Sequence, residues 1–194
     1  LDEPLSALDK MLRAQMQVEI RHLQQRLEMT TVFVTHDQEE ALTMSDRVAV
    51  MKDGRIQQAG SPREIYDHPR TEFVATFLGA SNILQATVRG KENGQTIIDL
   101  AGNVLRIGPS ASAEGSRLTL ALRPEKIFVG GPDGIPATIR EAIYKGAQTF
   151  LYLDLNGVAV SAVVQNSGAQ SIRFDVGTTV NLHWDQDNMV ELTP

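Results

Sequence analysis

The order of hydrophobic and polar residues changes near Gly79. Before that residue, helical and extended patterns alternate, and the first helical pattern repeats apolar residues at spacings of four or three. These residues are Leu8, Leu12, Met16, Ile20, Leu23 and Leu27. They share one face of a predicted helix over 8–28. The run TVFVT at 31–35 is short, almost continuously apolar and rich in β-branched residues, which predicts a buried parallel strand.

Shorter elements with clear end signals complete this first part. Asp37 stands three residues before a glutamate, a capping-box-like spacing that predicts a short helix. A strand then runs into the dipeptide Asp53-Gly54, which is typical of a tight hairpin. Ser61 is followed by a proline and, three residues on, by a glutamate, which predicts a further helix. A last short helix is expected over 71–79.

From residue 82 onward, short β-type runs are separated by Gly, Pro, Asn and Asp. The runs of the first half are ILQATVRG, QTIIDL, NVLRIG and SRLTLALRPEKIFV. They are echoed by IPATIREAIYKG, TFLYLDL, VAVSAVV and TTVNLHWDQDNMVEL. Such repetition of short strands predicts a duplicated tail of two intertwined units with OB-like barrel character.

Composition excludes several classes of protein. No apolar run approaches the roughly 18 residues that a membrane-spanning helix needs. The chain has no cysteine, which excludes disulfides and thiolate metal sites and fits a reducing compartment. The formal net charge is −6 and Lys and Arg form no cluster, which argues against general nucleic-acid binding. The four histidines are scattered without the spacing of metal ligands.

The opening stretch, LDEPLSALD, has a purely structural interpretation. Ser6 would cap the following helix, and Asp9 would complete an S-x-x-D capping box. Asp2 and Glu3, with the proline that follows, would form an exposed acidic turn. Because acidic turns before capped helices are common, this interpretation is favoured when the stretch is taken alone.

A functional interpretation needs a second site at the right distance, and His36 provides it. If residues 1–3 end a strand, the long helix is the crossover of a βαβ unit that leads to the strand at 31–35. Glu3 and His36 then emerge at the same carboxyl edge of the sheet, where ligands of open α/β sheets bind. Pro4 favours extended geometry at Glu3.

These residues carry a resemblance to a known family. LDEPLSALD, followed by TVFVTHDQEEALTMSDRVAVMKDGRIQQAGSPREIY, resembles the ATP-binding subunit of an ABC importer over residues 1–80. The tail, with LRPE at 122–125 and YKG at 144–146, is similar to the regulatory barrels of sugar, polyamine and ferric-iron importers, and most to the polyamine group. The resemblance implies an α/β remnant of a P-loop ATPase domain over 1–80 and an all-β tail of duplicated OB-like barrel units over 81–194.

The resemblance also assigns roles. Asp2 matches the aspartate that holds magnesium through its water shell, and Glu3 matches the carboxylate that polarises the water attacking the γ-phosphate. His36 matches the switch histidine that contacts the γ-phosphate. Ser6 and Asp9 match the loop that crosses the interface of an ATP-sandwiched dimer. ATP and magnesium are therefore the expected cofactors of the whole protein.

The implied function is that of a transport-coupled ATP hydrolase on the inner face of the cell membrane. Its expected partners are a second copy of itself, integral-membrane permease subunits and, indirectly, a solute-binding protein, with no nucleic acid. The preferred substrate is a polyamine. The motif G-x-x-x-x-G-K-[ST] is missing, so the chain is expected to be the C-terminal part of a longer protein and inactive by itself.

Two alternatives belong to other classes of protein. The chain could be a non-catalytic module that presents its tail to an effector, a protein or a second copy. OB-like units can also bind oligonucleotides by stacking bases on aromatic side chains. Most of the tail aromatics are expected to be core residues instead. They are Phe128, Tyr144, Phe150, Tyr152, Phe174 and Trp184.

Overall fold

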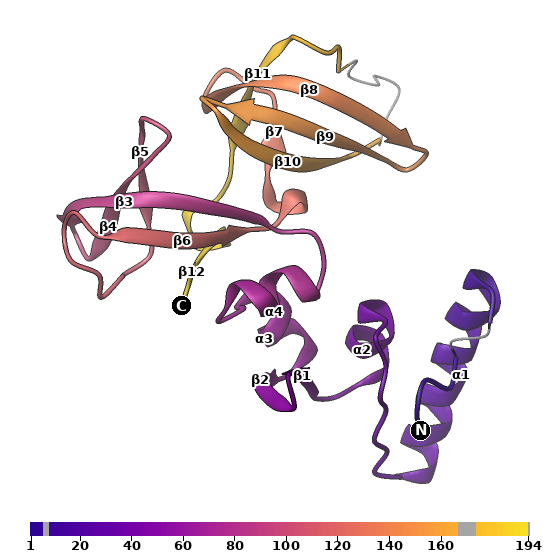
Figure 1. The fold of residues 1–194 in the computed structure, drawn as a ribbon. Helices are drawn as coiled ribbons and strands as arrows, with labels where there is room; N and C mark the ends of the chain where they lie inside the picture. The colour runs from indigo at the N-terminus through magenta and orange to yellow at the C-terminus, as the bar shows by residue number, and fades with distance from the viewer. Residues whose placement is uncertain (6–7, 167–173, 194) are drawn as a thin grey trace. The chain divides into compact units, whose positions relative to one another are not determined.

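A computed structural model describes residues 1–5, 8–166 and 174–193 (Figure 1). The chain divides into two compact units. Unit 1 consists of Leu1–Pro69 with Phe77–Gly79, and unit 2 of Arg70–Thr76 with Ala80–Pro194. Whether residues 1–80 are an ATPase remnant and 81–194 a regulatory tail stays a prediction.

The predicted long helix is confirmed as α1, Lys10–Leu27. Its N-cap is Asp9, whose side chain accepts hydrogen bonds from the amides of Met11 and Leu12. Asp9 therefore takes the capping position that the structural interpretation gave to Ser6, which lies outside the described residues. The apolar face of α1 is only partly covered, because three residues of the predicted repeat are more than a third exposed. They are Leu12, Leu23 and Leu27.

The prediction of a buried strand at 31–35 is wrong. The segment is extended, but it has one isolated parallel bridge, between Asp2 and Val34, and belongs to no sheet of the described residues. Val32 and Val34 are 73% and 56% exposed. A parallel strand is buried only when strands pair with both its edges and helices cover its faces. Those neighbours do not come from the described residues, so the α/β sheet is present only as this bridge.

The short elements of unit 1 follow their local signals. Helix α2, Gln38–Met44, is capped by Asp37 as predicted. Strands β1, Val48–Lys52, and β2, Arg55–Gly60, form the predicted hairpin. Both residues of its turn have positive φ, 51° at Asp53 and 73° at Gly54, as a tight hairpin requires.

Two short helices end this part of the chain. Helix α3, Pro62–Asp67, begins at a complete capping box between Ser61 and Glu64. Helix α4, Glu72–Phe77, corresponds to the helix predicted over 71–79. These elements confirm predictions that depended on residues only a few positions apart.

The tail is mostly β and repeats one order of elements (Figure 1). The first half holds β3 (Asn82–Glu92), β4 (Gln95–Leu100), β5 (Asn103–Ile107), β6 (Arg117–Leu122), a 3-10 turn and β7 (Phe128–Val129). The second half holds β8 (Ile135–Lys145), β9 (Gln148–Leu155), β10 (Val158–Gln165), β11 (Thr179–His183), a 3-10 turn and β12 (Met189–Leu192). This repetition matches the predicted duplication.

The two halves exchange their last strands. Among the described residues the tail has two five-stranded sheets, with the orders β12-β6-β3-β4-β5 and β10-β9-β8-β11-β7. Strand β7 thus pairs with the second half and β12 with the first. The predicted intertwining is confirmed in this form. Neither order returns to its first strand among the described residues, so the sheets are half-barrels, and the OB-like character of the two units stays a prediction.

An arginine at a β-bulge marks the same place in each half. Arg89 lies at the bulge of β3 and contacts Asp99 on β4 with an N–O distance of 2.6 Å. Arg140 lies at the bulge of β8 and contacts Asp154 on β9 at 2.7 Å. Each aspartate also accepts a backbone amide of the following turn. The hydrogen bond from the arginine lowers the pKa of each aspartate most, and the hydrogen bond from the backbone amide lowers it further. The ionised aspartate therefore stabilises the fold at neutral pH, and this stabilisation is lost as the pH falls through the lowered pKa.

The core of the tail is formed by aliphatic residues that alternate along both sheets, including Ile98, Leu120, Ile139 and Leu151. The prediction that most tail aromatics are core residues is wrong. Phe128, Tyr144 and Tyr152 are 55%, 74% and 45% exposed, and Phe174 and Trp184 are only partly buried against the core. Tyr152 alternates with inward-facing Leu151 and Leu153 on β9, so the pleat directs its side chain outward.

Candidate active site

The first three residues run parallel to the extended segment 31–35. The amide of Glu3 donates to the carbonyl of Val34 at 2.8 Å, and the amide of Val34 donates to the carbonyl of Leu1 at 2.9 Å. Asp2 and Val34 form the parallel bridge. Because both segments run the same way, Glu3 and His36 follow at the same end, as the βαβ interpretation predicted.

Glu3 and His36 are in direct contact. The distance from Glu3 Oε1 to His36 Nδ1 is 2.7 Å. The side chains are 46% and 75% exposed, so the pair lies at an open surface. The expectation that Pro4 holds Glu3 extended is wrong, since Glu3 has φ 42°. Left-handed backbone in a residue other than glycine is strained, and such strain clusters at functional sites.

The carboxylate of Glu3 raises the pKa of His36, first through its hydrogen bond and then through its charge. Burial lowers this pKa, and the charges of Asp37 and Glu40 raise it by smaller amounts than Glu3 does. Below the ordinary pKa of 6.5 the ring is charged in both folded and unfolded chains, and the ion pair stabilises the fold. That stabilisation is lost as the pH rises through the raised pKa.

This contact predicts an NMR result on residues 1–194. The ring of His36 is expected to titrate above 6.5, and Glu3→Gln is expected to move the midpoint down toward that value. Glu39→Gln is the matched control, because Glu39 is a nearby carboxylate that does not contribute to the shift. A midpoint at or below 6.5 in the unchanged chain would contradict the contact.

The backbone on both sides of His36 is held by polar side chains. Thr35 Oγ1 accepts the amide of Asp37 at 3.0 Å and donates to Glu40 Oε2 at 2.7 Å. Asp37 Oδ1 accepts the amides of Glu39 and Glu40 at 2.8 Å and 3.3 Å. Glu40 itself is 6% exposed. The residues flanking His36 are therefore fixed by the start of α2.

The other predicted site residues lie around this pair. Asp2 is exposed and directly precedes Glu3. Asp9 is exposed and caps α1, while Ser6 lies outside the described residues. No group of three or more His, Asp or Glu that could hold a metal ion occurs in the part of the chain that the structure describes. The structure thus brings Glu3 and His36 together and leaves Asp2 beside them.

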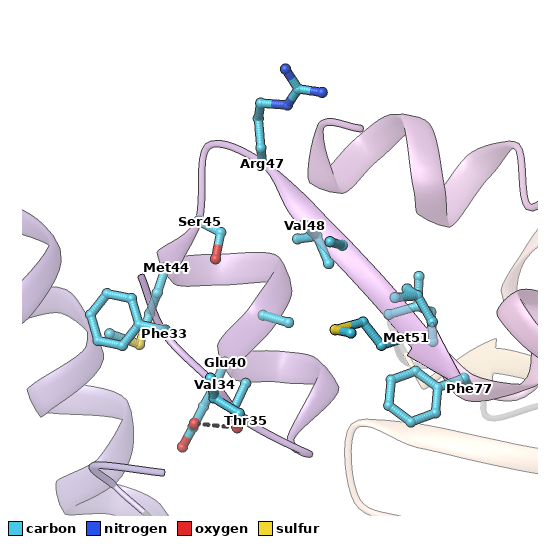
Figure 2. Close-up of a pocket in the computed structure, with 14 residues that line it drawn as sticks. Phe33, Val34, Thr35, Glu40, Met44, Ser45, Arg47, Val48, Met51 and Phe77 are labelled. Atoms are coloured by element: carbon cyan, nitrogen blue, oxygen red, sulfur yellow. Dashed lines mark hydrogen bonds between the residues drawn. The ribbon is translucent and has the colours of Figure 1, made fainter. Parts of the chain in front are cut away.

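Two cavities flank the extended segment 31–35 in unit 1. One, of about 230 Å³, is lined by Phe33 and Val34 together with Val48 and Met51 of the β1 strand (Figure 2). The other, of about 530 Å³, shares Phe33, Val34 and Met51 with the first. Val34 and Met51 are both more than half exposed. Apolar side chains of two extended segments therefore face open space.

Sequence reasoning missed Arg13, which lies near the start of α1. Its guanidinium contacts Asp37 at 3.0 Å, the residue directly after His36. It also donates to the carbonyl of Leu8 at 3.0 Å. A basic residue one turn into a helix is a weak signal, because nothing nearby in the sequence shows which loop it reaches.

Comparison with known proteins places the chain in a class. A family model described as the TOBE domain matches residues 120–192. Curated import ATP-binding proteins match nearly the whole chain. The chain is therefore homologous to the C-terminal half of the ATP-binding proteins of ABC importers and carries a TOBE domain. It spans about half the length of these relatives.

Two relatives and one solved structure illustrate what the chain is similar to. The Spermidine/putrescine import ATP-binding protein PotA of Ruegeria pomeroyi is 46% identical over 185 residues, which cover 94% of this chain and 50% of that protein. The Fe(3+) ions import ATP-binding protein FbpC of Rhizobium etli is 45% identical over 148 residues, which cover 75% of this chain and 42% of that protein. A solved structure of the molybdate-binding protein ModG covers 58% of this chain and 96% of its own, with a TM-score of 0.49 and 12% identity.

No helix among the described residues is both long and apolar enough to cross a membrane.

Proposed function

We propose that residues 1–80 are the C-terminal part of the ATPase domain of an ABC importer and that residues 81–194 are its regulatory tail. The observation that carries this proposal is the contact between Glu3 and His36 at the matching ends of two parallel segments. Phosphoryl transfer asks a protein mainly for positioning and charge neutralisation. A carboxylate and an imidazole held together at an open edge suit both tasks.

The donor set at this edge fits magnesium. Magnesium prefers hard oxygen ligands, keeps several waters, and is usually bound by one or two carboxylates together with phosphates. Asp2 supplies such a carboxylate, exposed and next to Glu3. We assign Asp2 to hold the ion through its water shell. When bound, the ion supplies neutralisation of phosphate charge.

Glu3 and His36 have separate tasks in this proposal. Glu3 orients and polarises the water that attacks the γ-phosphate. His36 contacts the γ-phosphate and stabilises the closed state. Because Nδ1 faces Glu3 and the side chain is 75% exposed, Nε2 is the nitrogen that can reach a phosphate. Its raised pKa keeps the ring protonated to higher pH, which favours contact with an anion.

Other features of unit 1 support the proposal that it is part of a larger domain. The cavities beside residues 31–35 and the exposed side chains of Val34 and Met51 are what the edges of an incomplete sheet present. We propose that strands of the N-terminal half, which the relatives have, fill this space and bring the phosphate-binding loop. Ser6 and Asp9 belong to the loop that crosses the interface of an ATP-sandwiched dimer.

The proposed partners and location follow from the relatives. A homodimer through the ATPase domain and the tail couples ATP hydrolysis to permease subunits, and a solute-binding protein delivers the substrate to them. The protein then lies on the inner face of the cell membrane through the permease. Relatives named for spermidine and putrescine import support a polyamine as the substrate. A relative named for Fe(3+) ions import shows that the chain is also similar to importers of other substrates.

The experiment that tests this function compares residues 1–194 with a fusion that places them behind the N-terminal half of the Ruegeria pomeroyi relative. Residues 1–194 alone are expected not to bind ATP in the micromolar range by calorimetry, because the backbone amides and lysine of a phosphate loop normally supply phosphate affinity. The fusion is expected to bind and hydrolyse ATP. Micromolar binding by residues 1–194 alone would contradict this prediction.

The intact relative is the control for assay conditions. A fusion that folds cooperatively but ignores ATP, while the intact relative hydrolyses it, would favour the alternative of a non-catalytic regulatory or dimerisation module.

A further inference from the structure

Arg13 contacts a residue just before its own helix α1 and the start of helix α2, next to the candidate active site. Its Nη2 donates to the carbonyl of Leu8, just before α1, at 3.0 Å. Its Nη1 donates to Asp37 Oδ2 at 3.0 Å, and its Nε lies 3.9 Å from Glu40 Oε1. Arg13 and Asp37 have side chains only 29% exposed. The fixed directions of the guanidinium donors let Nη1 and Nη2 bond Asp37 and Leu8 at once, while buried Nε makes only the longer charge contact with Glu40.

Asp37 passes this contact on to His36. One of its oxygens accepts Arg13, and the other accepts two amides in the first turn of α2. His36 is the residue directly before Asp37, and its ring reaches Glu3 from there. Movement of Asp37 therefore moves the base of the His36 side chain.

We propose that Arg13 is a positioning residue that holds His36 against Glu3 by fixing Asp37, and that it ties this pair to Leu8, just before α1. Its effect on hydrolysis rests on the proposed function. Its effect on the contact between Glu3 and His36 does not, because that contact is present in residues 1–194 themselves.

A second arginine of α1 provides a matched control. Arg21 donates to the carbonyl of Met44 at 3.1 Å and pairs with Asp46, at the far end of α2. Arg13 and Arg21 thus connect the same two helices, but only Arg13 does so beside His36. A purely structural role in joining α1 to α2 would give both arginines the same effect.

The first test measures nuclear Overhauser contacts between the His36 ring and the Glu3 side chain in residues 1–194. Arg13→Gln is expected to remove these contacts, Arg13→Lys to weaken them and Arg21→Gln to keep them. Asp37→Asn is the second variant, because asparagine still caps α2 but no longer forms a charged pair with Arg13. Asp37→Asn is also expected to weaken the contacts between His36 and Glu3. It keeps the proposal testable if Arg13→Gln prevents unit 1 from folding.

Contacts that persist unchanged in both Arg13→Gln and Asp37→Asn would overturn the proposal. Equal loss in Arg13→Gln and Arg21→Gln would overturn it as well, because it would indicate a general loss of helix packing.

The second test uses the fusion protein. Arg13→Gln is expected to lower kcat for ATP hydrolysis by at least about tenfold with KM within about twofold, since it disturbs geometry needed in the transition state. Arg13→Lys is expected to recover part of the loss, and Arg21→Gln to stay within about twofold of the unchanged fusion. A rise in KM with unchanged kcat would overturn the positioning role. If Glu3→Gln leaves hydrolysis intact, the proposed function fails while the Overhauser test still decides the role of Arg13.

Discussion

Glu3→Gln in the fusion protein is expected to lower the kcat of ATP hydrolysis by about 10³-fold while ATP still binds. Glutamine keeps the shape and hydrogen bonding of Glu3 but removes the charge that polarises the attacking water. We propose that ATP binding, and not its hydrolysis, closes the dimer, so this variant is expected to accumulate as an ATP-bound dimer. A steady-state assay measures kcat, calorimetry measures ATP binding, and light scattering measures the amount of dimer.

His36→Ala and Asp2→Asn separate the roles around Glu3. His36→Ala also loses turnover, but its ATP-bound dimer is expected to be shorter-lived, because a contact to the γ-phosphate itself is gone. Asp2→Asn is expected to weaken binding that depends on magnesium, since a carboxylate is replaced by a neutral amide. The three variants are thus expected to differ in ATP binding, dimer lifetime and magnesium dependence, although each of them reduces turnover.

Near-normal hydrolysis by Glu3→Gln would show that the acidic pair is wrongly assigned. Asp2 and Glu3 would then return to the interpretation of an exposed acidic turn, although with Asp9 and not Ser6 as the N-cap of α1. Glu39→Gln is the control for loss of a carboxylate near His36, because Glu39 lies in the first turn of α2 without perturbing the pKa of His36.

Local signals predicted the short elements well because each depends on residues a few positions apart. The capping box at Ser61 and the hairpin at Asp53-Gly54 needed no knowledge of the rest of the chain. Which distant strands pair could not be obtained in this way, and the partners of β7 and β12 appear only in the structure.

The candidate site was predictable only in part. That Glu3 and His36 emerge at one edge follows from the parallel direction of two extended segments, which the long helix between them required. The left-handed backbone of Glu3 and the contact from Arg13 to Asp37 depend on how loops pack in three dimensions. A run of apolar residues at 31–35 indicated burial, but burial requires neighbouring strands that the described residues do not supply.

The second large expected effect is a difference in amide exchange between the two units of residues 1–194. Unit 1 contains a two-stranded hairpin and an extended segment with a single bridge, and both are weak sources of stability by themselves. Unit 2 contains two five-stranded sheets over one aliphatic core. Amides in 31–51 are therefore expected to exchange at least about 100-fold faster than those in 118–129 and 148–164.

A core variant identifies the source of this protection. Leu120 is fully buried in the tail, and Leu120→Ala is expected to lower the free energy of unfolding of the tail by about 3 kcal/mol, because it removes buried methyl groups and leaves a cavity. Exchange in 118–129 and 148–164 is expected to rise together, while exchange in 31–51 stays unchanged. Val104→Ala, at a site that is 69% exposed on β5, is the matched control and is expected to have little effect. In the unchanged chain, slower amide exchange in 31–51 than in the tail would contradict this placement of the stable core. In Leu120→Ala, an equal rise of exchange in all three segments would mean that both units unfold as one.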